Sequence, residues 1–390
     1  MMTRSIAILG STGSIGRSTV EVAKKHPGCF RVRALAAHSN IELLALQCRE
    51  FRPQYVGIVD PSAAGGLRSL LADQEIEIVV GADEVVRLAG VDDVDMVVNA
   101  IVGAAGLRAS VETVRAGKLL ALANKESLVA GGPLFADMIK KSSGAKILPI
   151  DSEHSAIWQV LNCGRRNEIR QLIITASGGP FRTLPLEQFT EITAEQALNH
   201  PTWKMGPKIT VDSATLVNKG LEVIEATALF SFSADQITVV VHPQSIIHSA
   251  VEFVDSSIIA QMSRPDMRLP ITYALFWPER VESDFGCLDL TRCADLTFEA
   301  PDFERFPALK LAFEVAKTGG TAPAVFNAAN EVAVAAFLKN SVLFTSISDI
   351  IARTVETVSV VSKPSLEDVL GVDGEARRVA ESMIGKTTCC

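Results

Sequence analysis

The chain has 390 residues, a net charge of −8 and 48% hydrophobic residues. A chain of this length exceeds one ordinary core, so we expect two or three domains. The acidic balance argues against a nucleic-acid partner, and no apolar run is long enough to cross a bilayer. The seven cysteines are an odd number without metal-ligand spacing, which favours free thiols and a cytoplasmic location.

The first motif is a glycine-rich turn. A buried strand at 5–9 is predicted to run into Gly10-Ser-Thr-Gly13-Ser-Ile-Gly16, and a helical pattern follows at 15–25. In this setting the glycines let the backbone approach a pyrophosphate, whose charge the helix N-terminus stabilises. The spacing is GxxGxxG rather than GxGxxG, and a tight turn without a ligand is the alternative. We expect a dinucleotide here.

A second strand, at 30–36, ends in Ala37-His38-Ser39-Asn40. A site for NAD usually has an acidic residue here, which bonds the ribose 2′-hydroxyl. None is present, and small polar groups with His38 and Arg33 nearby leave room for a 2′-phosphate. The loop therefore favours NADPH, while the alternative for His38 is a solvent-facing loop residue.

Strands and helices continue to alternate up to about residue 121, which predicts a parallel, doubly wound sheet of the Rossmann type. Ligands of such sheets bind at the carboxyl ends of the strands. Gly103, Ala104 and the polar triple Asn124-Lys125-Glu126 fall at such ends. The alternative for the triple is a helix cap with exposed charges.

A strand at 146–150 ends at Asp151-Ser152-Glu153-His154. In extended chain Asp151 and Glu153 point to the same side, and Mg²⁺ or Mn²⁺ takes oxygen ligands of this kind. The alternative is N-capping by Asp151 or Ser152 with Glu153 in the first helical turn, and both can hold together. We expect His154 to be a packed neighbour rather than a ligand.

The middle of the chain carries candidate anion-binding groups. A strand at 172–175 leads into Ser177-Gly178-Gly179, whose hydroxyl and backbone N–H groups are suited to an anion. The segment 199–207 carries His200, and Trp203 between two prolines, and we predict a lid that excludes water from a substrate. The alternative for Trp203 is packing on the domain surface.

A short strand is predicted at 208–211, followed by a polar cluster and an amphipathic helix. Ser213, Asn218 and Lys219 near a helix start are suited to a phosphate, and Glu222 one turn further to a metal. The alternative is a helix simply N-capped by Ser213 or Asn218. We predict four parts: 1–150 dinucleotide-binding, 151–280 catalytic α/β with the lid, a connecting arm at 281–305, and a helical domain at 306–390 that serves only packing.

Eight motifs in this order make the chain closely similar to the 1-deoxy-D-xylulose 5-phosphate reductoisomerase family, essentially from end to end. They are GSTGSIG, ANKESLV, PIDSEHSAIWQ, ITASGGPF, NHPTWKMGPKITVDSATLVNKGLEVIEA, VHPQSIIHS, PDMRLPI and FNAANEVAVAAFL. The resemblance implies an NADP-dependent oxidoreductase of isoprenoid biosynthesis. It would rearrange the ketose phosphate and reduce the resulting aldehyde with NADPH to 2-C-methyl-D-erythritol 4-phosphate.

The resemblance also implies a set of site residues and a small phosphorylated sugar as substrate. Exposed strands in the middle domain favour a homodimer, and we expect contact with neither nucleic acid nor membrane. Mg²⁺ or Mn²⁺ would be held by Asp151, Glu153 and Glu222, and would chelate substrate oxygens. The residues implied as catalytic are Lys125, Glu153 and His200. The substrate would contact Lys125, Ser152, Glu153, Ser177, His200, Trp203, Ser213, Asn218, Lys219 and Glu222. The cofactor would contact Thr12, Gly13, Ser14, Ile15, His38, Ser39, Asn40, Asn124, Glu126 and Gly206.

The chain departs from the family pattern at 37–40, which lacks the lysine that some members carry near the 2′-phosphate. Ser39 and Asn40 can still donate hydrogen bonds, so NADPH remains the expected cofactor. Two other functions stay open on the residues alone. A different metal-assisted Rossmann dehydrogenase would not require the phosphate cluster, and an NADP-binding sensor would not require the three carboxylates.

Overall fold

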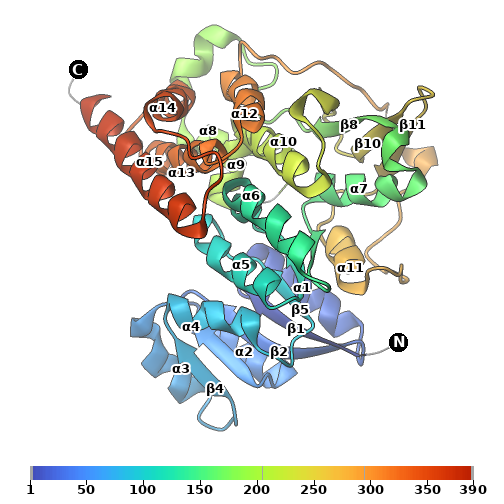
Figure 1. Ribbon diagram of the computed structural model, residues 1–390, viewed down its shortest axis with the longest axis vertical. Coiled ribbons are helices and arrows are strands. Elements are labelled where there is room, and N and C mark those ends of the chain that lie inside the picture. Colours follow the sequence, from blue (N-terminus) through green and yellow to red (C-terminus); the bar gives the residue numbers. More distant parts are fainter. Residues whose placement is uncertain (1–2, 204, 294, 388–390) are drawn as a thin grey trace. The chain divides into compact units, whose positions relative to one another are not determined.

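The computed structural model describes residues 3–203, 205–293 and 295–387, and the chain forms two compact units (Figure 1). The first unit comprises Met1–Ser127, Phe135–Ser155 and Asp266–Phe285. The second comprises Leu128–Leu134, Ala156–Pro265 and Gly286–Cys390. The four-part division expected from the sequence stays a prediction.

The first unit is a parallel seven-stranded sheet in the order β4-β3-β2-β1-β5-β6-β7. Its strands are β1 (Arg4–Leu9), β2 (Phe30–Ala37), β3 (Tyr55–Ile58), β4 (Glu77–Val80), β5 (Met96–Asn99), β6 (Leu119–Leu122) and β7 (Lys146–Pro149). Its helices are α1 (Ser14–Lys25), α2 (Ile41–Phe51), α3 (Ala64–Leu70), α4 (Ala82–Arg87), α5 (Leu107–Arg115) and α11 (Arg268–Phe276), with most of α6 (Lys125–Lys141). The predicted doubly wound α/β fold is confirmed, and its central strands are nearly continuous apolar runs because helices cover both faces.

The parallel strands direct the predicted ligand segments to one edge of this sheet. The segments that begin at Gly10, His38, Ala100, Asn124 and Asp151 each follow the carboxyl end of a strand. β1 lies between β2 and β5, so the chain reverses its direction of winding there. This is the switch point at which open α/β sheets bind their ligands.

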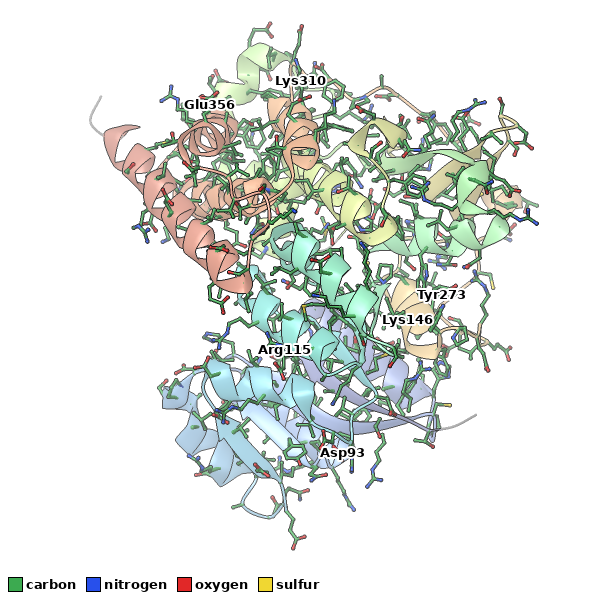
Figure 2. The ribbon with its side chains drawn as sticks, viewed as in Figure 1. Asp93, Arg115, Lys146, Tyr273, Lys310 and Glu356 are labelled. Atoms are coloured by element: carbon green, nitrogen blue, oxygen red, sulfur yellow. The ribbon has the colours of Figure 1, made fainter. Side chains whose placement is uncertain are left out.

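Arg33 does not support the 2′-phosphate site as expected. It is the extra residue of a bulge in β2, where the register with β1 shifts. Its guanidinium forms an ion pair with Asp93, a residue that precedes β5 and is labelled in Figure 2. That pair lies toward the amino ends of the strands, so Arg33 belongs to the opposite edge from His38.

The second unit combines a four-stranded sheet, in the order β11-β10-β8-β9, with a helical bundle. The strands are β8 (Ile169–Ala176), β9 (Ile237–Val241), β10 (Ile247–Phe253) and β11 (Ile258–Met262). The helices are α8 (Ala194–Ala197), α9 (Pro207–Ala214), α10 (Val217–Phe230), α12 (Pro307–Thr318), α13 (Ala322–Leu338), α14 (Phe344–Thr357) and α15 (Leu366–Thr387). The helix α7 (Ser152–Val160) belongs to this unit from residue 156 onward. Exposed Lys310 and Glu356 lie on the outer sides of α12 and α14, whose apolar sides are buried (Figure 2).

Two predicted elements of the second unit were wrong. Residues 208–211 are not a strand but the first half of α9, which begins with Pro207 at a favoured N-terminal position and packs on α13. The alternation of Ile209 and Val211 suggested a strand, and helical packing overrides that propensity. The sequence of the C-terminal segment also predicts two helices, at 365–370 and 375–384, but the structure has the single helix α15 there. No helix within the described residues is both long and apolar enough for a membrane span.

Candidate active site

The glycine-rich turn of the first unit has the geometry of a pyrophosphate loop. Gly10 adopts φ +82°, and a Cβ there would lie 2.5 Å from the carbonyl oxygen of Ala100. Gly13 is the N-cap of α1 and has no side chain with which to cap the first turn. The N–H groups that follow it, beginning with exposed Ser14, are therefore available to an anion. Thr12 and Ile15 flank this loop and are partly exposed.

The loop after β2 is fully accessible, since His38, Ser39 and Asn40 are all exposed. Asn40 also caps α2, because its Oδ1 accepts a hydrogen bond from the N–H of Leu43 at 3.1 Å. The alternative of a solvent-facing His38 agrees with the structure, and its contact with a 2′-phosphate stays a prediction.

Asn124 and Glu126 form a buried polar cluster at the end of β6. Asn124 caps α6 by accepting from the N–H of Ser127 at 2.9 Å, so the cap of the alternative is confirmed, but its exposed charges are wrong because Lys125 and Glu126 are buried. Its amide donates to the carbonyls of Ile101 and Gly103, at 2.6 and 2.8 Å. It therefore joins the ends of two neighbouring strands. Glu126 accepts from the same amide at 3.1 Å.

Lys125 and Asp151 are brought together by the adjacency of β6 and β7. The Lys125 Nζ lies 3.1 Å from Asp151 Oδ2, and the lysine side chain is only 5% exposed. The other oxygen, Oδ1, accepts from the N–H of Glu153 at 3.2 Å and so caps α7. Capping by Asp151 is thus confirmed, and one carboxylate serves two partners.

Glu153 stands in the first turn of α7, where Ser152 donates to its Oε2 at 2.6 Å. His154 is completely buried, with its Nδ1 3.2 Å from Asp151 Oδ1. The expectation that His154 is a packed neighbour agrees with this burial. Glu153 is more accessible than His154, so it is better placed to meet a ligand.

In the second unit, His200 joins Ser177 and Ser213, residues from three separate segments. Its Nε2 lies 3.0 Å from the Ser177 hydroxyl and 3.1 Å from the Ser213 hydroxyl. Its Nδ1 accepts from the N–H groups of Thr202 and Trp203, at 3.1 and 2.9 Å. An imidazole that accepts at Nδ1 carries its proton on Nε2 when neutral. His200 therefore presents an N–H donor to the two hydroxyls.

Burial lowers the pKa of His200 below its ordinary value of 6.5, so the neutral ring is favoured near neutral pH. With Nε2–H donating toward one hydroxyl, the serine hydroxyls retain protons of their own that can turn toward a ligand. Two hydroxyl donors and the neutral imidazole that orients them thus converge on one spot. Such a cluster suits the oxygens of an anion.

Close backbone approach holds these groups in place. Gly179 adopts φ +68°, and a Cβ there would lie 2.7 Å from the carbonyl oxygen of Ser213. The turn that carries Ser177 can therefore press directly against the end of α9. Leu216, a non-glycine residue at φ +56°, makes the sharp turn from α9 into α10. Such a conformation costs about 1–3 kcal/mol and is typical of functional turns.

Asn218, Lys219 and Glu222 lie on the first turns of α10 and contact one another. The Asn218 amide donates to Glu222 Oε1 at 2.6 Å, and the Lys219 ammonium pairs with Glu222 Oε2. Glu222 is fully buried and Lys219 nearly so. The alternative of a simple N-cap is wrong for both candidates: Ser213 lies inside α9, Asn218 lies inside α10, and Leu216 holds the cap position without a side-chain bond.

The segment predicted as a lid is irregular from Asn199 to Gly206, and Lys204 falls outside the described residues. Trp203 is partly buried, with its ring 6.3 Å from that of His248, so packing within the unit accounts for part of its burial. Gly206 is exposed and precedes α9. Movement of the lid and contact of Gly206 with a cofactor stay predictions.

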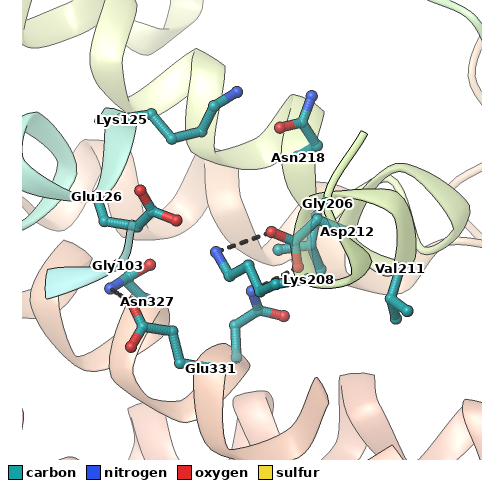
Figure 3. A network of polar contacts seen from close by, with 12 residues as sticks. Gly103, Lys125, Glu126, Gly206, Lys208, Val211, Asp212, Asn218, Asn327 and Glu331 are labelled. Carbon is teal, nitrogen blue, oxygen red and sulfur yellow. Dashed lines mark hydrogen bonds and ion pairs between the residues drawn. The ribbon is translucent and has the colours of Figure 1, made fainter. Parts of the chain in front are cut away.

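The sequence places Asp212 in the polar cluster but gives no role to this carboxylate, which is buried beside the site. Asp212 is fully buried in α9, and it pairs with Lys208 at 2.8 Å (Figure 3). Asn330 of α13 donates to its other oxygen at 2.8 Å. The only signal in the sequence was the Lys208–Asp212 spacing of one helical turn, which a predicted strand at 208–211 concealed.

Comparison with known proteins agrees with both units. Residues 6–132 match the family model described as 1-deoxy-D-xylulose 5-phosphate reductoisomerase. Residues 147–230 and 262–379 match models of C-terminal domains of the same enzyme. A relative named 1-deoxy-D-xylulose 5-phosphate reductoisomerase from Chlorobaculum tepidum is 53% identical and aligned over 98% of this chain and all of its own length.

The chain belongs to the 1-deoxy-D-xylulose 5-phosphate reductoisomerase family. A further reductoisomerase, from Bacteroides thetaiotaomicron, is 48% identical over 98% of this chain and 97% of its own. The structure of the Zymomonas mobilis reductoisomerase in complex with NADPH superimposes with a TM-score of 0.92, at 45% identity, with 98% of this chain and 99% of that one covered. A reductoisomerase solved with NADPH, fosmidomycin and magnesium superimposes equally well, at 40% identity over 99% of both chains.

Proposed function

We propose that this reductoisomerase-family chain converts 1-deoxy-D-xylulose 5-phosphate into 2-C-methyl-D-erythritol 4-phosphate, with NADPH and a divalent cation, in the non-mevalonate isoprenoid pathway. The observation that carries the proposal is the convergence of Ser177, His200 and Ser213 on one spot at the end of α9, which α10 with Lys219 follows in the chain. Neutral donors together with an ammonium suit the phosphate of the substrate. Neither a sensor nor an unrelated dehydrogenase requires that cluster.

NADPH binds at the carboxyl edge of the sheet in the first unit. The N–H groups after Gly13 receive the pyrophosphate, because Gly10 allows the turn to lie against β5. The exposed Ser39 and Asn40 donate to the 2′-phosphate in place of the lysine found in some family members. Without a fixed positive charge there, discrimination against NADH is weaker than in those members.

The proposed metal ligands fit a hard divalent cation. The ligands that the resemblance implies, Asp151, Glu153 and Glu222, are all carboxylates, and Mg²⁺ and Mn²⁺ prefer oxygen ligands. Such a cation acts as a Lewis acid on ketone and hydroxyl oxygens. Lys125 pairs with Asp151 in this structure, so its ammonium is available to balance negative charge near the carboxylates.

The remaining residues bind and orient the substrate. The hydroxyl of Ser152 and the ammonium of Lys125 donate to substrate oxygens, and Asn218 extends the phosphate site along α10. His200 acts as a neutral donor rather than an acid, since its pKa is lowered by burial. Glu153 is the proposed proton-transfer group. Trp203 covers the substrate from the segment 199–207 and excludes water from the reaction.

We further propose that the chain works as a homodimer in the cytoplasm. The edge strand β11 and the turn before it leave Val254, Ile258 and Ile259 exposed, at 55, 59 and 38%. An apolar sheet edge of this kind is suited to pairing with a second copy. The cysteines Cys29, Cys48, Cys163, Cys287 and Cys293 are all free thiols, which fits a reducing compartment. Light scattering on the purified protein tests the dimer.

One assay tests the proposed function. Purified protein with 1-deoxy-D-xylulose 5-phosphate and Mg²⁺ or Mn²⁺ is expected to oxidise NADPH, and a chelator is expected to stop the reaction. Product analysis should give 2-C-methyl-D-erythritol 4-phosphate. Absence of turnover with either metal would refute the proposal, whereas turnover that persists in chelator would refute only its metal part.

A further inference from the structure

We propose that Lys208, Asp212 and Asn330 are positioning residues that hold helix α9 so that the Ser213 hydroxyl stays on His200. The inference rests on the proposed function of Ser213 as a phosphate ligand. It assigns a role in substrate binding to α13, a helix that the sequence associated only with packing. All five residues belong to the second unit.

The carboxylate of Asp212 is a buried charge. The Asp212 side chain is 1% exposed, with one oxygen 2.8 Å from Lys208 Nζ and the other 2.8 Å from Asn330 Nδ2. Burying an ion pair brings little net stability, and apolar residues of similar size often pack at least as well. Asp212 is therefore poorly explained by stability alone. Its two directional contacts specify a geometry.

The two contacts of Asp212 fix how α9 packs against α13. Lys208 lies one turn before Asp212, so their ion pair ties the first turn of α9 to its second. Asn330 belongs to α13, and its bond to Asp212 fixes the rotation and the axial position of α9 against that helix. Three points on two helices are thus joined through a single carboxylate.

The position of Asp212 in the sequence links it to the ligand site. Ser213 follows Asp212 directly, and its hydroxyl lies 3.1 Å from His200 Nε2. Side-chain tips lie about 5 Å from a helix axis, so a rotation of α9 by about 20° would move the hydroxyl by about 1.7 Å. That displacement breaks a hydrogen bond. The tight approach of Gly179 to the Ser213 carbonyl would be lost as well.

The test compares Asp212→Asn with wild type in four measurements: KM and kcat for the ketose phosphate, the inhibition constant of inorganic phosphate, and the Kd for NADPH. Asparagine keeps the shape and the bond from Asn330 but loses the charge that pairs with Lys208. We expect KM and the phosphate constant each to rise about tenfold, which corresponds to the loss of one charge-assisted contact. The kcat should fall less than KM rises, and NADPH binding should not change.

Matched variants separate positioning from general stability. Lys208→Arg keeps the positive charge and should stay within about twofold of wild type, whereas Lys208→Met should match Asp212→Asn. Ile351→Val shortens a fully buried side chain of α14 and should lower the melting temperature without changing either constant. If Asp212→Asn does not fold, the comparison of Lys208→Arg with Lys208→Met decides the question.

Two results would overturn the inference. One is an Asp212→Asn or Lys208→Met enzyme that is less stable, like Ile351→Val, but has unchanged KM and phosphate inhibition. The other is a Lys208→Arg enzyme as impaired as Lys208→Met. Failure of the proposed function looks different, because wild type itself would then show no turnover. Direct calorimetric titration with inorganic phosphate would still test the positioning role in that case.

Discussion

Replacement of Glu222 by glutamine is the sharpest test of the proposed metal site. The Glu222 and Lys219 side chains are 1% and 4% exposed and form a buried ion pair, and Asn218 donates to the other oxygen at 2.6 Å. Glutamine keeps the shape and an oxygen acceptor, but it removes the negative charge beside a buried ammonium. Breaking a buried pair in this way costs about 3–5 kcal/mol. Domains are stable by about 5–15 kcal/mol, so the variant should fold with a lowered melting temperature.

The functional effect should be larger than the loss of stability. Glu222→Gln removes one of three carboxylates, and even outer ligand-sphere changes weaken metal binding about 10- to 100-fold. We therefore expect the Mn²⁺ dissociation constant, measured by electron paramagnetic resonance, to rise at least a hundredfold, roughly the upper end of that range. Turnover should collapse. The Kd for NADPH, measured by fluorescence quenching, should be unchanged because the glycine-rich loop belongs to the first unit.

Glu252→Gln is the matched control for this experiment. Glu252 is a carboxylate of β10 that pairs with Arg170 at 2.6 Å and has no place in the proposed site. Its replacement should leave metal affinity and turnover at wild-type values. An unchanged Mn²⁺ dissociation constant and unchanged turnover in Glu222→Gln would show that Glu222 is not a metal ligand.

Three further predictions concern the two binding regions. Gly10→Ala should abolish NADPH binding in a fluorescence titration, because its Cβ would lie 2.5 Å from the Ala100 carbonyl oxygen; tight binding would contradict the loop assignment. Ser213→Ala should raise KM for the ketose phosphate about tenfold with a smaller change in kcat, as for loss of one hydrogen bond to a charged group; an unchanged KM would remove Ser213 from the phosphate site. Because the pKa of His200 is lowered by folding, the unfolded chain binds more protons than the folded chain as the pH falls. The contribution of neutral His200 to the free energy of unfolding is therefore complete above pH 6.5. It is lost as the pH falls through the folded pKa. Chemical denaturation between pH 5 and 8, the range in which histidine titrates, should therefore give a free energy of unfolding that depends less on pH in His200→Gln than in wild type. An equal change of that free energy with pH in the two proteins would contradict this reasoning.

The first unit was largely predictable because its signals are local. Each strand end and the polar residues after it are continuous in sequence, and parallel strands carry those ends to one edge. The ion pair of Lys125 with Asp151 follows from that rule once β6 and β7 are neighbours. Arg33 is the exception, because a bulge changed which way its side chain points and no sequence pattern marked the bulge.

The second unit was less predictable because its contacts are remote. Asn330 and Asp212 are 118 residues apart, and no periodicity links them. The β-branched residues of 208–211 suggested a strand, and only packing against α13 favours a helix there. Ser177, His200 and Ser213 were each identified as candidates, but their meeting depends on the close approach of Gly179, which a single Ser-Gly-Gly turn does not reveal.

The contacts of Glu222 change how the site must be dissected. Lys219 and Asn218 were predicted as phosphate ligands and Glu222 as a metal ligand, yet in this structure the first two both bind the third. A cation that takes Glu222 would release a lysine and an amide for the phosphate, so the two ligands should assist each other's binding. Lys219→Met would in turn leave a buried carboxylate without this partner. The effects of single substitutions here should therefore not add, and only double-mutant cycles between Glu222 and Lys219 will apportion metal and phosphate binding.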